Sequence, residues 1–529
     1  MLIRHIFILV IGVSLAISCK PRNYDKTGGH SDSQPQETEK TAITAEEPPA
    51  PAPVPEPTAS MAIVQVTHQA YNQLQPWQKE EPSYSRGFAI YLGEGRFLTV
   101  ERVIRDATFL ELISSDGSKT VPASVAYSDP ESGLSLITVK NPDDASFFSG
   151  MVPVPIGKDL PLNSTVQLWQ FSDEGLPLVA DGTILSAEPF SADNDSPAFL
   201  YNRIRAALNP VTGGATIPVI SDGKLAGISL NYKESNQRAV TATVRVINGF
   251  LNNAAGNKPG FPVMGIQVAP LTDPVFREYL KLAPSGNGIY ITNVVPHSSA
   301  ARAGVKKGDV LESINGHAVD NRGLTRDPLL GPVPAGTLMH DSQSIGDTIH
   351  ITIRRDGKPM ELSLKMDRDA LDKDIISLDR AANAVPPYII YGGFVFQKFT
   401  DPYIKSLKDR NDGNMPMEFL ELLNNKADYA KEGAEEIVII GPVLPTPATL
   451  GYNNSGFCAV KKINGVPVKS LAHLAELLNK PGESDIIEIE TNKVPFKLYV
   501  SRSMCDASND ALQRRAIPVL RRLPSSQQS

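Results

Sequence analysis

The chain has 529 residues, of which 41% are hydrophobic and 21% charged, and its formal net charge is −7 at pH 7. This length predicts about three domains with sizeable hydrophobic cores. The negative net charge, without any run of Lys or Arg, argues against a nucleic-acid-binding protein.

The first 19 residues have the pattern of an export signal. Arg4 precedes an apolar run from Ile6 to Ile17, which is shorter than the roughly 20 residues that a membrane-spanning helix needs. The run ends in A-I-S-C, which resembles a bacterial lipoprotein signal and implies that Cys19 is lipidated. An ordinary cleaved signal peptide is the alternative. With lipidation, we expect a lipid-anchored protein of the bacterial cell envelope, on the periplasmic side.

Residues 20–60 are predicted to be a disordered tether, because they are polar and hold six prolines between Pro48 and Pro57. The remaining cysteines are Cys458 and Cys505. An exported setting permits a disulfide between them, and two unrelated thiols are the alternative.

Short strands separated by turns over residues 61–257 predict an all-β domain. Three motifs stand out, namely R-G-F followed by L-T-V-E-R-V-I at 98–104, S-D-P-E-S-G-L-S-L-I-T-V at 128–139, and A-A-L-N-P-V-T-G-G-A at 206–215. They resemble the motifs of the HtrA/Deg family of serine proteases. The resemblance implies a mainly β protein with a chymotrypsin-like double β-barrel, followed by two PDZ-like α+β domains.

In that family the three motifs supply a general-base His, an orienting Asp and a nucleophilic Ser. The matching positions of this chain hold Arg102, Gly133 and Thr212, and the nucleophile loop is one residue shorter. An Arg side chain stays protonated and cannot act as a base, while an internal Thr needs an adjacent base. We therefore expect no catalytic residues at these positions, and a pseudoprotease that is not an enzyme.

Other residues of the domain offer a weak replacement for the missing groups. His68 is the one histidine in residues 61–257 and lies far in sequence from the motifs. Asp129, Glu131 and Glu101 are carboxylates near the motifs, and we interpret them as surface charges.

A first PDZ domain is predicted at residues 258–370. The segments P-H-S-S-A-A-R-A-G-V-K-K-G-D-V-L at 296–311 and I-N-G at 314–316 resemble the core of HtrA PDZ modules. Such modules add an extended peptide to a sheet edge and capture its terminal carboxylate with backbone N–H groups. The apolar-x-Gly-apolar loop that does so matches Val263, Met264, Gly265 and Ile266. A first strand that only packs the core is the compatible alternative.

Residues 385–503 form a second predicted PDZ-like domain, and residues 504–529 a C-terminal tail. Y-G-G-F-V-F at 391–396 resembles the second PDZ-like domain of plant-type Deg proteases. Gly392, Gly393, Phe394 and Val395 are therefore candidate peptide-binding residues. The resemblance implies mainly an assembly and regulatory role for this domain, so peptide binding there remains open.

Together these patterns predict a scaffold or adaptor that binds C-terminal or unfolded polypeptide segments in the cell envelope. One alternative is an active HtrA-type serine endopeptidase in protein quality control, and another is a vestigial structural envelope protein. The family resemblance implies a trimer-based homo-oligomer. We expect no metal or cofactor, because the histidines and cysteines lack the spacing of a ligand set.

Overall fold

The computed structural model describes residues 54–192, 197–209, 216–258, 260–337, 343–378, 385–481, 484–515 and 517–523. The predicted signal, Cys19 and residues 20–53 of the predicted tether lie outside these ranges. The end of the tether differs from the prediction, because α1 (Pro57–Ser60) is a short helix with proline in its first turn. Proline fits there since the first helical N–H groups have no partner in the helix.

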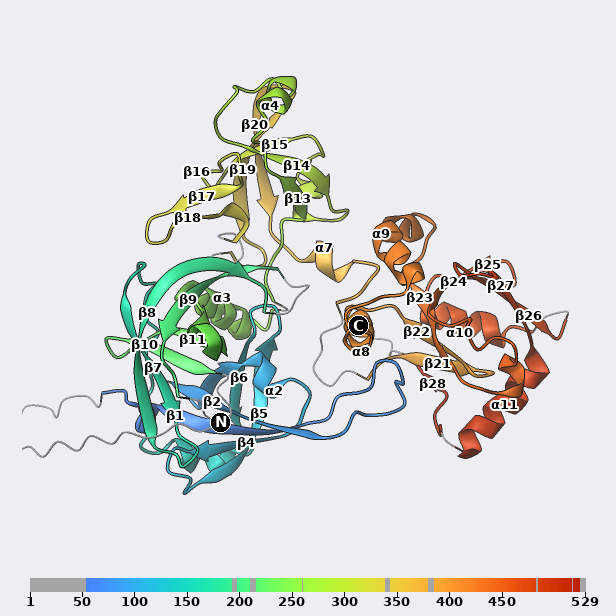
Figure 1. Cartoon of the computed structure of the whole chain (residues 1–529), viewed down its shortest axis with the longest axis horizontal. Helices are drawn as coiled ribbons and strands as arrows, with labels where there is room; N and C mark the ends of the chain where they lie inside the picture. Colours follow the sequence, from blue (N-terminus) through green and yellow to red (C-terminus); the bar gives the residue numbers. More distant parts are fainter. Residues whose placement is uncertain are drawn as a thin grey trace, which may run out of the picture. The chain divides into compact units, whose positions relative to one another are not determined.

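The N-terminal half folds as two closed β-barrels, which confirms the predicted double barrel (Figure 1). The strands of the first barrel are paired in the order β1-β2-β3-β6-β5-β4. Phe88, Phe97 and Leu136 are buried inside it, as expected for alternating strands that close on a core. Its strands are β1 (Met61–His68), β2 (Ser83–Gly93), β3 (Arg96–Val100), β4 (Ala107–Ser114), β5 (Thr120–Asp129) and β6 (Leu134–Val139).

The second barrel has the order β10-β11-β12-β9-β8-β7 and its own core around Leu168, Ile204 and Val219. Helix α3 (Val244–Ala255) follows it and buries Phe250 in the core of the first barrel. The strands are β7 (Thr165–Phe171), β8 (Pro177–Phe190), β9 (Phe199–Ala206), β10 (Ile217–Ser221), β11 (Lys224–Lys233) and β12 (Arg238–Ala242).

The first PDZ domain is a sheet of order β13-β14-β15-β19-β20, with β16 paired to β15. Strand β13 is an edge strand of this sheet. A separate hairpin, β17–β18, packs Leu330 and Val333 against Leu200 of the second barrel. The elements are β13 (Ile266–Ala269), α4 (Pro274–Tyr279), β14 (Ile289–Val294), α5 (Ser299–Arg302), β15 (Val310–Ile314), β16 (His317–Ala318), β17 (Leu324–Asp327), β18 (Gly331–Pro334), β19 (Thr348–Arg355) and β20 (Lys358–Lys365).

The second PDZ domain has a sheet of order β27-β26-β24-β23-β22-β21-β28, with β25 paired to β24. Its elements are β21 (Tyr388–Tyr391), β22 (Phe394–Lys398), α8 (Asp401–Arg410), α9 (Met417–Lys431), β23 (Val438–Val443), β24 (Cys458–Ile463), β25 (Val466–Pro467), α10 (Leu471–Asn479), β26 (Ile486–Thr491), β27 (Lys497–Ser501), α11 (Arg502–Arg515) and β28 (Arg521–Arg522). The short helix α7 (Asp369–Asp372) lies between the two PDZ domains in the chain.

The boundary predicted at residue 504 is too early. Helix α11 and strand β28 belong to the second PDZ domain, because α11 packs on β21 and β28 pairs with the same strand. Ile517 and Leu520 are buried there beside Tyr388 and Ile390. Most of the expected tail is thus part of the domain rather than an appendage.

The loop at residues 69–82, between β1 and β2, reaches into the second PDZ domain. Leu74 is buried in a cluster with Phe399 and Tyr403, and the Trp77 ring meets the Tyr388 ring at 6.2 Å between centroids. None of the helices in the described parts of the chain is long and apolar enough to span a bilayer.

Candidate functional site

Two of the three predicted triad positions meet in a cleft of the barrel domain. Strand β3 leads into α2 (Glu101–Ile104), where the Arg102 guanidinium donates to the Leu230 carbonyl at 3.2 Å. Arg102, Gly133 and Leu230 line a cavity of about 240 Å³, together with Lys405 of the second PDZ domain. Thr212 lies outside the described residues.

Gly133 fits its position because it has no side chain. Its φ is +66°, and a Cβ atom there would lie 2.6 Å from Leu230 Cδ2 and 2.9 Å from Ala192 Cβ. Any larger residue would therefore require Leu230 to move, in addition to the cost of a left-handed backbone. The Gly133 carbonyl accepts the Glu101 N–H at 2.9 Å, which holds the two cleft segments together.

His68 is held at the end of β1, and it does not line this cavity. Its Nδ1 lies 2.6 Å from the Arg105 carbonyl oxygen, and its Nε2 lies 2.6 Å from Ser85 Oγ. When Nδ1–H donates a hydrogen bond to this carbonyl, Nε2 accepts a hydrogen bond from the Ser85 hydroxyl group. These contacts anchor the start of β2 to the segment after α2.

The three carboxylates that we interpreted as surface charges are all buried, so that interpretation was wrong. The Glu101 carboxylate accepts hydrogen bonds from Nε and Nη2 of Arg105, with N–O distances of 2.7 to 3.1 Å. Asp129 accepts from the backbone N–H groups of Glu131 and Ser132 and from Ser132 Oγ at 2.6 Å. Burial, and then the charge of Glu131, raises the pKa of Asp129 to about 6.

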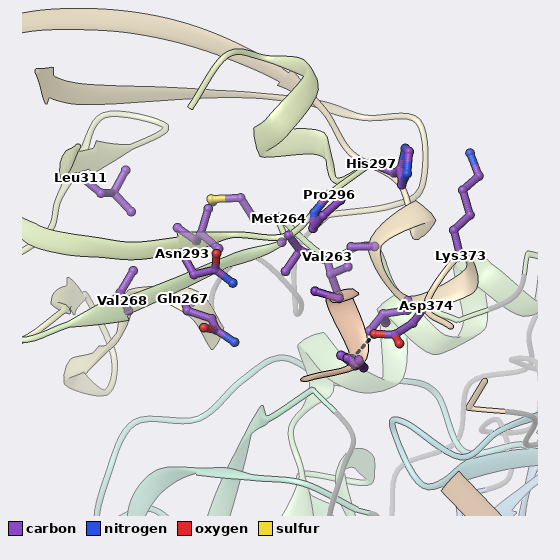
Figure 2. A pocket seen from close by; sticks show the side chains of 18 of the residues that line it. Val263, Met264, Gln267, Val268, Asn293, Pro296, His297, Leu311, Lys373 and Asp374 are labelled. Carbon is purple, nitrogen blue, oxygen red and sulfur yellow. Dashed lines mark hydrogen bonds and ion pairs between the residues drawn. The ribbon is translucent and has the colours of Figure 1, made fainter. Parts of the chain in front are cut away.

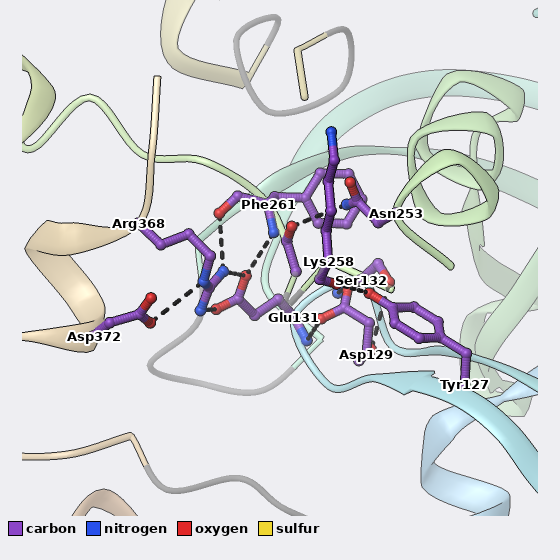
Figure 3. Close-up of polar contacts among 10 residues, drawn as sticks. Tyr127, Asp129, Glu131, Ser132, Asn253, Lys258, Phe261, Arg368 and Asp372 are labelled. Carbon is purple, nitrogen blue, oxygen red and sulfur yellow. Dashed lines mark hydrogen bonds and ion pairs between the residues drawn. The ribbon is translucent and has the colours of Figure 1, made fainter. Parts of the chain in front are cut away.

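Glu131 makes a buried link to the first PDZ domain (Figure 3). Arg368 donates to Glu131 Oε2 at 2.7 Å and to Oε1 at 2.9 Å, and also to the Phe261 carbonyl at 2.9 Å. Both side chains are at least 90% buried. The fork of a guanidinium matches a carboxylate, so this pair fixes orientation as well as charge. Nothing in the sequence pattern around Arg368 points to this partner.

The predicted peptide-binding loop of the first PDZ domain has the geometry to receive a carboxylate. The carbonyls of Met264 and Gly265 are occupied by the N–H groups of Ala300 and Val295. Within the described residues, the N–H groups of Met264 and Gly265 have no acceptor. A Cβ atom on Gly265, whose φ is +78°, would lie 2.2 Å from Ser298 Cβ, so only glycine fits this loop.

The loop lines a groove together with residues of β13, β14 and β15. The cavity measures about 760 Å³ and has an apolar floor that includes Met264, Leu311 and Ile314. Figure 2 shows Gln267 and Val268 along one side of it. Among the described strands β13 pairs with β14 alone, so its other edge can accept an added strand. All four predicted residues, Val263 to Ile266, line this groove.

The corresponding loop of the second PDZ domain is closed, which contradicts the peptide-binding role predicted for Gly392 to Val395. The Gly392 N–H donates to Asn509 Oδ1 of α11 at 2.8 Å, and its carbonyl accepts the Thr446 hydroxyl. Phe394 and Val395 are fully buried in β22, between β21 and β23. These four residues therefore pack the interior and offer no free edge to a ligand.

Of the two alternatives for the cysteines, the structure has the unbridged one. Cys458 and Cys505 are free and fully buried in the core of the second PDZ domain. The Cys458 Sγ instead lies 3.3 Å from the Ser455 carbonyl oxygen. Burial raises the pKa of each thiol to about 12, so both stay protonated at neutral pH.

Comparison with known proteins gives matches over both halves of the chain. One PDZ domain model matches residues 262–366 and another matches residues 379–521. Protease Do-like 2, chloroplastic, of Arabidopsis thaliana is 27% identical over 463 residues, which cover 85% of this chain and 72% of that protein. Periplasmic serine endoprotease DegP of Escherichia coli (strain K12) is 23% identical over 307 residues, covering 55% and 59%.

Among solved structures, HtrA-type protease AlgW with decapeptide matches with a TM-score of 0.43 and 18% identity. The match covers 58% of this chain and 95% of that one.

The relatives overturn the expectation that the chain is not an enzyme. That expectation came from Arg102, Gly133 and Thr212 at the triad positions. Both relatives are named proteases, and the similarity to the first extends over 85% of this chain. The similarity therefore points to a protease, which was the alternative left open by the sequence.

Proposed function

This chain is a homologue of the Deg/HtrA proteases that carries two PDZ domains, and we propose that it is an endopeptidase that captures polypeptides by their C termini. The capture site is the groove of the first PDZ domain. The observation that carries this proposal is the free edge of β13 beside the two unpaired N–H groups of Met264 and Gly265.

A bound segment would lie antiparallel to β13 and add a strand to its sheet. Its backbone would pair with the exposed residues Gln267 and Val268, and its terminal carboxylate would accept from the Met264 and Gly265 N–H groups. The last side chain would enter the apolar cavity above Leu311 and Ile314. These contacts favour an unfolded segment or a chain end with an apolar terminal residue.

Peptide binding can be measured by fluorescence polarisation with a labelled hexapeptide that ends in a free apolar residue. We expect Gly265→Val to weaken binding at least 100-fold, because the new side chain meets Ser298. Gly117→Val is the matched control, since Gly117 also has a positive φ but has open space around it. Equal binding by wild type and the Gly265 variant would refute capture by this loop.

We place hydrolysis in the cleft that Arg102 and Gly133 line. Thr212 is the proposed nucleophile, because its hydroxyl precedes the Gly pair of the third motif. Its proton has to pass to a base other than the residues at the other two triad positions, because neither Arg102 nor Gly133 can accept it. Arg102 lines the cleft as a permanent cation, and such a group stabilises the negative charge that develops on a carbonyl oxygen. Gly133 leaves room in the cleft and supplies no carboxylate.

Cleavage of an unfolded casein-type substrate by the mature chain, without residues 1–19, tests this assignment. We expect proteolysis and labelling by a serine-directed fluorophosphonate, and we expect Thr212→Ala to abolish both. Proteolysis that persists in the variant would refute Thr212 as the nucleophile. No proteolysis by the wild-type chain would refute the endopeptidase.

We also propose a lipid-anchored location on the periplasmic side of a bacterial cell envelope, where a protease of exported proteins would meet its substrates. The A-I-S-C pattern that ends at Cys19 supports this location. Cys19→Ala should move the chain from the membrane fraction to the soluble fraction of a cell lysate. An unchanged distribution would refute the anchor.

The trimer-based assembly stays a prediction. Light scattering of the mature chain would measure its oligomeric state.

A further inference from the structure

One end of the peptide groove is built by residues from outside the first PDZ domain. The cavity of about 760 Å³ is lined on one side by the loop at Met264. It is also lined by Lys373 and Asp374, which follow α7 in the segment between the two PDZ domains, and by Lys426 and Ala430 of α9 in the second PDZ domain. Figure 2 shows Lys373 and Asp374 at the Val263 end of the groove, away from Val268 and Leu311. We name these outside residues the end wall.

The end wall adjoins the place where a ligand carboxylate would bind. The unpaired N–H groups of Met264 and Gly265 lie at the start of β13, and Val263 precedes them in the chain. A strand added antiparallel to β13 therefore ends at this wall. Its terminal carboxylate comes to the part of the cavity that holds the wall's charged side chains.

Each lysine of the end wall has a carboxylate partner. Lys426 forms an ion pair with Asp374, and Lys373 pairs with Asp369 at 2.9 Å. Glu435 and His297 line the same cavity. The Lys426 side chain keeps 42% of its surface exposed, so its ammonium group has room for a second partner. An ammonium has three donors and can serve two carboxylates at once.

We propose that Lys426 of the second PDZ domain is a specificity-determining residue of the first PDZ groove, where it binds the terminal carboxylate of the ligand. The proposal rests on the peptide-capture function proposed above. In the free protein, Asp374 holds Lys426 in place and competes for its charge. When a peptide binds, its carboxylate is held by the amides of one PDZ domain and the ammonium of the other. A free C terminus is then preferred over an internal segment.

The test compares two hexapeptides of the same sequence, one with a free C-terminal carboxylate and one with a carboxamide, on the full chain. We expect wild type to prefer the carboxylate peptide by about tenfold or more. Lys426→Met should reduce that preference about fivefold, through weaker carboxylate binding, and leave carboxamide binding unchanged. Lys431→Met is the matched control, because Lys431 lies on the same helix, pairs with Asp428 and does not line the cavity.

Asp374→Asn provides a test of opposite sign, which a folding defect cannot imitate. Its Oδ1 can still accept the Ile376 N–H, a bond of 3.0 Å in the wild-type chain. Removing the competing charge should strengthen carboxylate binding two- to fivefold without affecting the carboxamide peptide. An unchanged preference in both variants would refute the role of Lys426 while peptide capture stands. No binding of either peptide by wild type would refute peptide capture itself.

Discussion

The two PDZ domains use the same kind of glycine loop in opposite ways. In the first, the Gly265 loop lines a cavity, its N–H groups have no acceptor among the described residues, and the neighbouring strand β13 has a free edge there. In the second, Gly392 is bonded to Asn509 of α11, and β28 covers the edge of β21. The comparison teaches that the loop alone does not make a binding site. What decides is whether another part of the chain already occupies the sheet edge.

The two domains also differ in how they contact the barrels. The first is held by the buried pair of Arg368 and Glu131 in addition to the apolar hairpin contact with the second barrel. The second receives the apolar side chains of Leu74 and Trp77 from the loop after β1. A buried ion pair is sensitive to the loss of one partner, whereas an apolar contact loses stability in proportion to the area removed. Mutations should therefore act differently at the two contacts.

The largest expected effect comes from breaking the buried ion pair. Arg368→Met should destabilise the folded chain by about 3–5 kcal/mol, because it leaves the Glu131 charge buried without a partner. Thermal and urea unfolding of the full chain measure this loss. The double variant Glu131→Leu with Arg368→Met should recover most of it, because the carboxylate that would be left without its partner is then removed as well. A single variant as stable as wild type would show that the pair contributes nothing to the attachment.

Opening the closed edge of the second PDZ domain should have the next largest effect. Leu520 is buried against Tyr388 and Ile390, and its carbonyl accepts the Ile390 N–H at 2.7 Å. Leu520→Asp should release the last strand at a cost of at least about 2 kcal/mol, since a charge cannot stay in an apolar cluster. Hydrogen exchange at the Ile390 amide should then become faster.

The neighbouring residue Val519 gives the control for that variant. Its side chain is 42% exposed, so Val519→Asp should leave both stability and exchange nearly unchanged. Equal protection of Ile390 in the two variants would show that β28 does not seal this edge.

Sequence patterns predict those parts of the structure that are determined by residues close together in the chain. The strands of the barrels follow from local patterns, and the double barrel and the Gly265 loop follow from motifs that resemble those of the HtrA/Deg family. The closed state of the Gly392 loop does not, because Asn509, which accepts the Gly392 N–H, lies 117 residues further along the chain. The same holds for Arg368 and Glu131, whose separation of 237 residues leaves no local pattern. Burial of Asp129 likewise depends on packing that periodicity alone does not show.

The smallest expected effect of a mutation is a shift in the pH dependence of stability at the barrel side of the first PDZ contact. Burial raises the pKa of Asp129 to about 6, above its ordinary value of 3.8. Between these values the folded state keeps a proton that the unfolded chain has lost. This group's contribution to stability is therefore complete below about pH 4 and falls by up to about 3 kcal/mol as the pH rises through 6. Ser132→Ala removes a 2.6 Å donor that favours the charged form. The fall should then occur at a higher pH in unfolding curves measured from pH 4 to 8, and a fall at the same pH in both proteins would refute this origin.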